Sequence, residues 1–282
     1  MQIKALKMRW LTGGVNYSYL VSTSTTPVKS WIIDPAEVPE VVQQLTTQEM
    51  STITNIVNTH HHYDHADGNL GMYEYLKGKV HNNHDIQFIV GSRTPNVPLN
   101  DPNTFIVPKD GQTFKLGDDI TVKAIRTPCH TQDSVCYYFF DKSTDERAVF
   151  TGDTLFTAGC GRFFEGDGAE MDAALNHALI EKVDEPQKTY VYPGHEYTKS
   201  NVKFVKKCVY TKPGDNLAFD KLVETVSAKE VTTGLFTLND ELEFNPFMRL
   251  NDPLVRKAVG DEGHKKTTSA VMDALRTMKN KN

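Results

Sequence analysis

Histidine and aspartate residues gather in one short stretch of the chain. Residues 60–68 read His-His-His-Tyr-Asp-His-Ala-Asp-Gly and follow an apolar run typical of a buried strand, which places the stretch in a turn. His60 and His62 are two residues apart, so in an extended backbone their side chains point the same way while the intervening side chain points the other way. Asp64 and His65 are adjacent and can diverge toward a second centre. The spacing favours two metal ions over one and indicates a two-metal hydrolase.

Three later segments repeat this arrangement, in which a strand-like run is followed by a short turn with a good metal ligand. The ligands are His130 within 127–131, Asp153 within 151–154 and His195 within 192–196. Binding sites favour the ends of strands. A solvated His-rich loop without a role could explain the first stretch alone, but four such turns indicate one common site.

The composition is that of an ordinary globular protein. Of the 282 residues, 24% are charged and 39% are hydrophobic, and the length allows one or two domains. The net charge of -5 gives no indication of binding to nucleic acid or to an anionic membrane. No apolar run approaches the length of a membrane span, and residues 1–10 lack the apolar core of a signal peptide. We therefore expect a cytoplasmic protein without a membrane partner.

The alternation of apolar residues predicts a mixed α/β chain. Strands are expected at 3–7, 17–22, 30–33, 53–58, 87–90, 104–107, 120–126, 135–140, 148–151 and 189–192, and helices at 38–45, 69–77 and 169–183. Two packed sheets with outer helices are the natural solution for this order. Residues 78–110 are rich in Asn, Pro, His and Asp, which predicts a long loop. Helical segments at 200–210, 217–227 and 269–279 then predict a helical C-terminal domain.

The remaining candidate ligands are weaker. The four cysteines show no Cys-x-x-Cys spacing, so a disulfide framework is not expected in a cytoplasmic chain of this size. Cys129 adjoins a ligand and could be a soft ligand or a nucleophile, but the hard ligands suffice without it, which favours a packed residue. We assign Cys160 no chemical role. His81 and His84 have the spacing of a helix face, but without a further ligand nearby a solvated surface is favoured over a second metal site.

Longer motifs resemble one family. The metal motif resembles that of the metallo-β-lactamase superfamily. Four further segments are similar to glyoxalase II, the hydroxyacylglutathione hydrolases, and their sequences look closest to those of the fungal enzymes. These segments are Thr-Gly-Asp-Thr-Leu-Phe at 151–156, Gly-Cys-Gly-Arg-Phe-Phe-Glu-Gly at 159–166, Tyr-Pro-Gly-His-Glu-Tyr-Thr at 192–198 and Asn-Pro-Phe-Met-Arg at 245–249. The likeness runs through nearly the whole chain.

The resemblance implies a fold and a metal site. The fold would be a four-layer αββα metallo-β-lactamase sandwich over residues 1–197, followed by a helical substrate-binding domain over residues 198–282. Site one would comprise His60, His62 and His130, site two Asp64, His65 and His195, and Asp153 would bridge the two metals. All seven positions hold the expected residue. We expect two divalent ions per chain, zinc first, although imidazole and carboxylate ligands also suit iron and manganese.

The resemblance also implies a reaction. Two metals about 3.5–4 Å apart can share a water and lower its pKa from about 15.7 to about 7. The resulting hydroxide would attack the thioester carbonyl of an S-2-hydroxyacylglutathione such as S-D-lactoylglutathione, releasing glutathione and D-lactate in methylglyoxal detoxification. Asp64 and Asp153 are the carboxylates assigned to this chemistry. Asp34 is a candidate to orient an imidazole, although a turn-forming Asp before a proline is nearly as good an interpretation.

Five positions match substrate contacts of the family. Arg276 and Lys279 share a helix face and would hold the glycine carboxylate of glutathione, although a solvated basic helix is the alternative. Tyr197 matches a substrate-contacting Tyr. Arg162 stands where many members have Lys and also supplies a cation, whereas Phe164 stands where many have Tyr and lacks one hydroxyl contact.

Three other functions compete with this hypothesis. A mononuclear-iron glutathione persulfide dioxygenase shares most of the histidines, but the helical C-terminal region with its two cations disfavours it. A metal-dependent binding protein with a vestigial site is disfavoured by the seven intact ligands. A nucleic-acid-processing enzyme is disfavoured by the acidic net charge. We therefore expect a monomeric enzyme whose partner is a small glutathione thioester.

Overall fold

Two β-sheets form the centre of the molecule. The computed structural model describes residues 1–82, 84–97 and 105–282. The first sheet has the order β1-β2-β3-β4-β5-β6, and its strands are β1 (Gln2–Met8), β2 (Asn16–Ser22), β3 (Ser30–Ile33), β4 (Ile53–Val57), β5 (Gln87–Ile89) and β6 (Phe105–Ile106). The first three strands pair antiparallel and the last four pair parallel, so the sheet is mixed.

The second sheet has the order β13-β10-β9-β8-β7. Its strands are β7 (Thr113–Leu116), β8 (Ile120–Arg126), β9 (Val135–Asp141), β10 (Glu146–Gly152) and β13 (Thr189–Pro193). Only β10 and β13 pair parallel, so their carboxyl ends lie at the same edge of the sheet. A separate hairpin of β11 (Leu155–Phe156) and β12 (Gly159–Cys160) follows β10.

The two sheets pack face to face through an aromatic core. Trp31 of the first sheet is buried and meets the rings of Phe114 and Phe139 of the second sheet edge-on, with ring centroids 6.1 and 5.6 Å apart. Tyr19 contacts Phe150 in the same way at 5.1 Å. Burial of such large side chains is the main force that holds the two sheets together.

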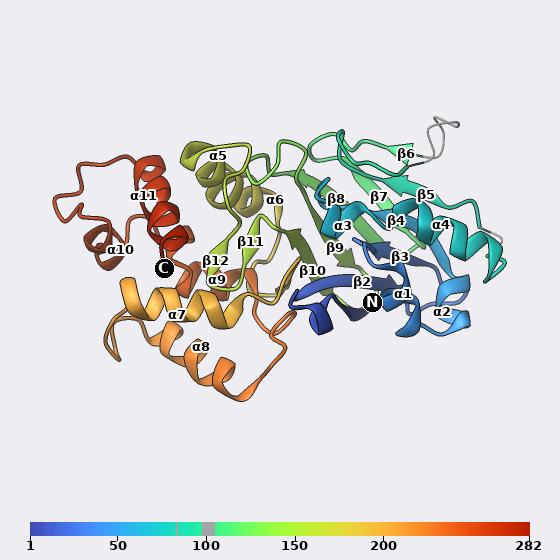
Figure 1. Ribbon diagram of the computed structural model, residues 1–282, viewed down its shortest axis with the longest axis horizontal. Coiled ribbons are helices and arrows are strands. Elements are labelled where there is room, and N and C mark those ends of the chain that lie inside the picture. Colours follow the sequence, from blue (N-terminus) through green and yellow to red (C-terminus); the bar gives the residue numbers. More distant parts are fainter. Residues whose placement is uncertain (83, 98–104) are drawn as a thin grey trace.

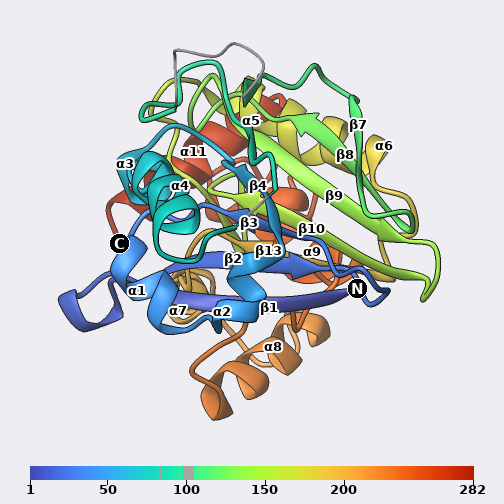
Figure 2. The same ribbon diagram turned by 90° about the vertical axis from the view of Figure 1, so that its right-hand side faces the viewer.

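Helices cover the outer face of each sheet. Val41 of α1 (Val38–Gln43) and Met72 of α4 (Asn69–Gly78) pack with Ile56 on the first sheet. On the second sheet, Met171 of α5 (Gly168–Ala173) packs with Val149. The order of layers is therefore helix, sheet, sheet, helix, which confirms the predicted αββα sandwich (Figures 1 and 2).

The C-terminal third is helical and lies at the end of the molecule remote from α1 and α2 (Figure 1). Its helices are α7 (Thr198–Cys208), α8 (Leu217–Ala228), α9 (Leu238–Phe244), α10 (Pro253–Ala258) and α11 (Thr268–Asn280), with a 3-10 turn η3 at Pro246–Met248. Polar side chains cap their starts: Asn216 accepts from the amide of Phe219, and Thr237 forms a capping box with Asp240. Helix α11 packs on α5, so this region shares a core with the second sheet.

Most predicted strands and helices appear within one to three residues of their expected bounds. The predicted helix at 169–183 is continuous through α5, η2 (Ala174–Leu179) and α6 (Ile180–Lys182). Position 104 of the predicted strand at 104–107 lies outside the described residues, as do 83 and 98–103 of the predicted loop. That loop segment also contains β5 and β6. Several short elements were not predicted, because two to seven residues are too few to show a hydrophobic period. They are α2 (Thr47–Ser51), α3 (Tyr63–Ala66), η1 (Trp10–Thr12), η3, α9, α10, β7, β11 and β12.

Candidate metal centre and substrate pocket

The seven predicted ligands lie together at one edge of the sandwich. His60 and His62 follow β4, His130 follows β8, Asp153 follows β10 and His195 follows β13. The expectation that the whole His-rich stretch is a turn was wrong for Asp64 and His65, which lie in the one-turn helix α3. This helix begins directly after His62, and it directs Asp64 and His65 toward His195 instead of toward His62 and His130.

The ligand atoms form three overlapping groups in which all atoms lie within 4.8 Å of one another. The groups are His60, His62 and His130; His60, His65 and Asp153; and Asp64, His65 and His195. The first and third are the two sites that the sequence analysis expected. The Asp153 carboxylate lies 3.5 Å from His130 Nε2 and 3.3 Å from His195 Nε2, so it reaches ligands of both sites.

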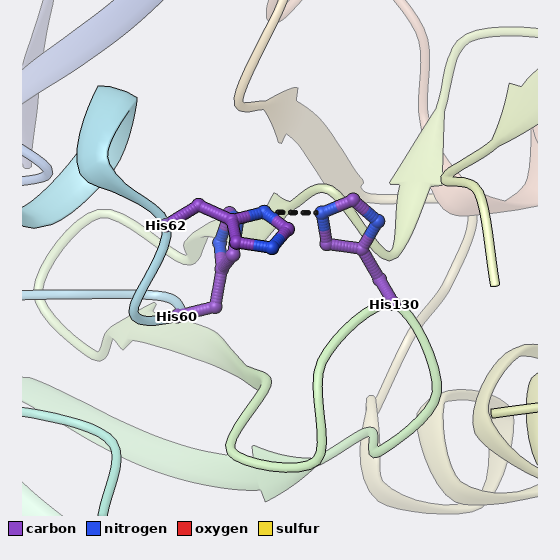
Figure 3. Close-up of side chains that lie close together, drawn as sticks. All are labelled: His60, His62 and His130. Carbon is purple, nitrogen blue, oxygen red and sulfur yellow. Dashed lines mark hydrogen bonds between the residues drawn. The ribbon is translucent and has the colours of Figure 1, made fainter. Parts of the chain in front are cut away.

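Imidazole nitrogens point toward one another in the first group (Figure 3). The Nδ1 atom of His62 lies 3.1 Å from Nε2 of His60 and 3.0 Å from Nε2 of His130. Burial, reinforced by neighbouring imidazoles, holds the pKa of His60 well below its usual range, and burial lowers the pKa of His130 to about 4. These two rings are therefore neutral at physiological pH, the state in which imidazole binds a metal.

The outward nitrogens of three ligand rings are already occupied. His65 Nδ1 donates to Asp34 Oδ2 at 3.0 Å, and His130 Nδ1 donates to the Arg162 carbonyl at 2.9 Å. His60 Nδ1 lies 3.1 Å from the Thr59 hydroxyl. Such partners fix the tautomer and leave Nε2 free to face the centre of the site.

Asp34 has a second contact that fixes its position. Its carboxylate accepts from the backbone amide of Thr59 at 2.8 Å and from the Thr59 hydroxyl at 2.7 Å. Asp34 itself has a left-handed backbone with φ of 51°, a conformation that Asp and Asn tolerate better than most residues. Of the two interpretations left open by the sequence, contact with a ligand imidazole is therefore confirmed.

The donor set fits divalent metal ions. Oδ1 of Asp153 is buried without a hydrogen-bond partner among the described residues, which is costly unless another group satisfies it. The His195 and His65 imidazoles overcome burial and keep the pKa of Asp153 well below its usual range, so this carboxylate is charged. A buried carboxylate among imidazoles is the ligand mixture that zinc, iron and manganese accept.

Backbone room at the centre depends on two glycines. A Cβ on Gly194 would lie 2.6 Å from Asp153 Oδ1 and 2.7 Å from His65 Cε1. A Cβ on Gly161 would lie 1.9 Å from the Asp153 carbonyl oxygen. These contacts explain why glycine precedes His195 and follows Cys160 in the sequence.

A pocket of about 960 Å³ opens from the metal centre toward the helical region. All five predicted substrate contacts line it, namely Arg162, Phe164, Tyr197, Arg276 and Lys279. The Tyr197 ring stacks on His195 with centroids 4.6 Å apart, and the exposed Phe164 ring lies 5.5 Å from the His62 ring. The pocket therefore joins the metal ligands to the two cations of α11.

The two α11 cations are held by neutral oxygens. Arg276 donates through Nη1 to the Cys160 carbonyl at 2.7 Å and through Nη2 to the Asn280 side chain at 2.8 Å, and Lys279 donates to the amide oxygen of Asn201. Burial, with a smaller contribution from Arg276, lowers the pKa of Lys279 to about 7. A buried arginine and a half-buried lysine beside one pocket favour an anionic ligand.

The weaker candidates occupy ordinary positions. Cys129 is buried, donates to the Asp167 carbonyl at 3.3 Å and belongs to none of the three ligand groups, and burial raises the pKa of its thiol. His81 and His84 follow the end of α4 in a non-helical segment, so the suggested helix face does not exist there. His61 turns away from the ligands and pairs with buried Asp133 at 2.7 Å.

Sequence reasoning missed one residue that contacts a candidate metal ligand and one that contacts a pocket cation. The Asn16 side chain on β2 donates to Asp64 Oδ2 at 3.0 Å and thereby lowers its pKa together with the His65 ring, against the effect of burial. Asn201 on α7 joins Lys279 to the Thr157 carbonyl. Neither residue belongs to a motif, and only tertiary structure brings them to the site.

Two family models and two yeast enzymes that match this chain relate it to the same family. Residues 11–195 match the metallo-beta-lactamase superfamily, and residues 196–282 match the hydroxyacylglutathione hydrolase C-terminus. The chain is 54% identical to the cytoplasmic hydroxyacylglutathione hydrolase isozyme of Saccharomyces cerevisiae, over all of both chains. It is 51% identical to the mitochondrial enzyme of that yeast, over 99% of this chain and 96% of the other.

More distant relatives share the fold. A probable hydroxyacylglutathione hydrolase of Schizosaccharomyces pombe is 44% identical over 96% of this chain and 95% of its own. A Staphylococcus aureus metallo-beta-lactamase structure matches with a TM-score of 0.59 at 18% identity, over 100% of this chain and 71% of the other. The structure of ETHE1 from Myxococcus xanthus matches with a TM-score of 0.54 at 21% identity, over 98% and 97% of the two chains. The predicted resemblance to the fungal enzymes is confirmed: the chain belongs to the hydroxyacylglutathione hydrolase family within the metallo-beta-lactamase superfamily.

Proposed function

We propose that this enzyme hydrolyses the thioester bond of S-2-hydroxyacylglutathiones, with S-D-lactoylglutathione as substrate and glutathione and D-lactate as products. One observation carries the proposal. A single pocket has converging imidazoles and carboxylates at one end and two cations, Arg276 and Lys279, at the other. Glutathione thioesters have a reactive carbonyl and, several bonds away, a carboxylate, so they match both ends.

The metal ligands divide into two sites in this proposal. One divalent ion would be held by His60, His62 and His130. The other would be held by Asp64, His65 and His195, and Asp153 would bind both ions. When bound, the ions would supply a hydroxide nucleophile at neutral pH and stabilise the negative charge that develops on the thioester oxygen. We propose zinc, with iron and manganese as alternatives. The Asp153 geometry across both groups supports two ions rather than one.

The protein residues orient the substrate. Arg276 and Lys279 would bind the glycine carboxylate, and Arg162 would add a third positive charge on the pocket wall. The Tyr197 hydroxyl lines the pocket and would donate a hydrogen bond, since burial raises its pKa to about 12 and keeps it protonated. The thiolate of glutathione is a good leaving group, so no side chain needs to protonate it.

A paired assay tests the proposal. Purified enzyme should hydrolyse S-D-lactoylglutathione, followed by release of the free thiol, and should lose this activity with a chelator. The same sample should consume no oxygen with glutathione persulfide. Oxygen uptake without thioester hydrolysis would instead assign a mononuclear-iron persulfide dioxygenase.

Three finer features belong to the same proposal. We propose residues 1–197 as the catalytic domain and residues 198–282 as the substrate-binding domain, supported by the start of α7 at Thr198. We propose a cytoplasmic monomer that acts in methylglyoxal detoxification, and the full-length match to the cytoplasmic yeast isozyme supports the location. Within the described residues, no helix is long and apolar enough to span a membrane. Cell fractionation and sedimentation measure location and mass directly.

A further inference from the structure

The β11–β12 hairpin connects the two ends of the pocket. It begins two residues after Asp153 and ends two residues before Arg162, whose carbonyl binds the His130 ring. Its last residue, Cys160, presents its carbonyl oxygen to Arg276 Nη1 at 2.7 Å. The Asn280 side chain on α11 accepts from Nε and Nη2 of the same guanidinium, so the hairpin supplies the acceptor for Nη1, the group that α11 does not bind itself.

Two buried polar residues of the helical region hold the hairpin. Glu241 on α9 accepts through Oε2 from the backbone amide of Ala158 at 3.0 Å. The Asn245 side chain donates to the carbonyls of Phe156 at 3.3 Å and Gly159 at 3.1 Å, and to Glu241 Oε2 at 2.9 Å. Both side chains have no exposed surface. The hairpin backbone is thus bonded at three points to one pair of residues.

The hairpin needs this support because it is too short to be stable alone. It has two residues on each strand, and a two-stranded hairpin is marginal in water even when longer. Its turn residue Ala158 has a left-handed backbone with φ of 54°, an unfavourable conformation for alanine. Without Glu241 the buried amide of Ala158 would have no acceptor, and an unsatisfied buried amide is costly.

The Asn245 contacts also give a role to a motif that the metal chemistry leaves unexplained. Asn245 begins the Asn-Pro-Phe-Met-Arg segment, and its Oδ1 accepts from the Phe247 amide at 3.0 Å to start η3. The Phe247 ring lies 6.0 Å from the Arg276 guanidinium. The segment therefore contacts the hairpin and the cation together.

We propose that Glu241 and Asn245 are positioning residues for substrate binding: they fix the β11–β12 hairpin so that the Cys160 carbonyl aims Arg276 into the pocket. The inference rests on the proposed function, because it gives Arg276 the glycine carboxylate as ligand. Neither residue lines the pocket, so both act through the hairpin. Burial raises the pKa of Glu241 to about 8, so a neutral amide is a close substitute for this side chain.

The test compares KM and kcat for S-D-lactoylglutathione in matched variants. Glu241→Leu keeps the volume but removes the acceptor, and we expect KM to rise about tenfold, equivalent to about 1.4 kcal/mol, with kcat and metal content changed less than about threefold. Glu241→Gln should restore KM to within about threefold of wild type. Glu243→Ala, an exposed carboxylate on the same helix, is the control and should leave both constants unchanged.

A double mutant separates positioning from general destabilisation. In an Arg276→Ala background, Glu241→Leu should raise KM by less than about twofold, because the cation to be positioned is gone. Asn245→Ala serves as a second variant should Glu241→Leu fail to fold. A folded variant of either kind with wild-type KM, or a full tenfold effect without Arg276, would overturn the inference. Wild-type enzyme without thioesterase activity would instead refute the proposed function.

Discussion

The metal centre and the α11 cations are built in opposite ways. The ligands follow the ends of four strands, β4, β8, β10 and β13, and partners such as Asp34 and the Arg162 carbonyl occupy their outward atoms. Arg276 and Lys279 come from one helix near the C-terminus, far from the ligands in sequence, and reach the same pocket because α11 packs on α5. Their direction depends on a carbonyl and an amide oxygen of neighbouring segments.

This difference separates the reaction from recognition. Hydrogen bonds from neighbouring residues hold the ligands of the centre, so we expect its chemistry to depend on few residues with large effects. The cation pair depends on contacts between segments, so many residues with moderate effects set substrate affinity. Changes at the centre should therefore lower kcat, and changes at the cations should raise KM.

The largest effect is expected at Asp153. Asp153→Ala removes the carboxylate that reaches ligands of both groups and should lower kcat/KM by more than about 100-fold, since loss of an outer partner alone costs about 10–100-fold. Metal content per chain should fall in the same sample. Asp184→Ala, an exposed carboxylate outside the pocket lining, is the control. Retention of full activity and two metals by Asp153→Ala would remove the basis of the dinuclear site.

The cations should show the opposite signature. Arg276→Ala or Lys279→Ala removes one charge-assisted hydrogen bond to a carboxylate, worth about 1.5–3 kcal/mol, so KM should rise by about 10–100-fold with a smaller change in kcat. A thioester without the glycine carboxylate should be hydrolysed equally by variant and wild type. Lys281→Ala, an exposed neighbour, is the control. A fall in kcat at constant KM would contradict the assignment of substrate binding to the α11 cations and of the reaction to the metal centre.

A smaller effect is expected from the partner of His65. Asp34→Asn suits the left-handed backbone but weakens the acceptor for His65 Nδ1, and metal affinity or kcat should fall about tenfold. Metal affinity is measured by competition with a chelator. An increase in KM at unchanged metal affinity would show that Asp34 acts on recognition instead of on the centre.

The smallest effect concerns pH. Because the pKa of Lys279 is lowered to about 7, its positive charge is present below that pH and is lost as pH rises above it. The Ki of glutathione as a competitive ligand should therefore rise about three- to tenfold between pH 6 and pH 8. The same measurement in Lys279→Ala provides the baseline, which should be flatter. Equal slopes in both proteins would show that another group titrates.

The sequence predicted the regular core and the ligand set better than it predicted the supports. The turns that carry His60, His130 and His195 could be predicted, because a buried apolar run and the polar turn that follows it are both visible in the local sequence. The one-turn helix α3 and the β11–β12 hairpin have no such signal, because each is held by contacts with distant segments.

The same reason explains the missed residues. Asn16 precedes Asp64 by 48 positions, and Glu241 follows Ala158 by 83, so neither contact is local. The family resemblance identified Arg276 and Lys279 as a pair, but it gave no information on the carbonyl that directs Arg276. Supports of this kind require tertiary structure.

The most direct test of the account is a metal titration of the apoenzyme, with hydrolysis of S-D-lactoylglutathione measured on each sample. The account predicts that kcat rises until two divalent ions are bound per chain and that KM remains nearly constant once both are present, because the α11 cations bind the distant carboxylate independently. Full kcat with one ion per chain, or hydrolysis that persists without metal, would contradict it.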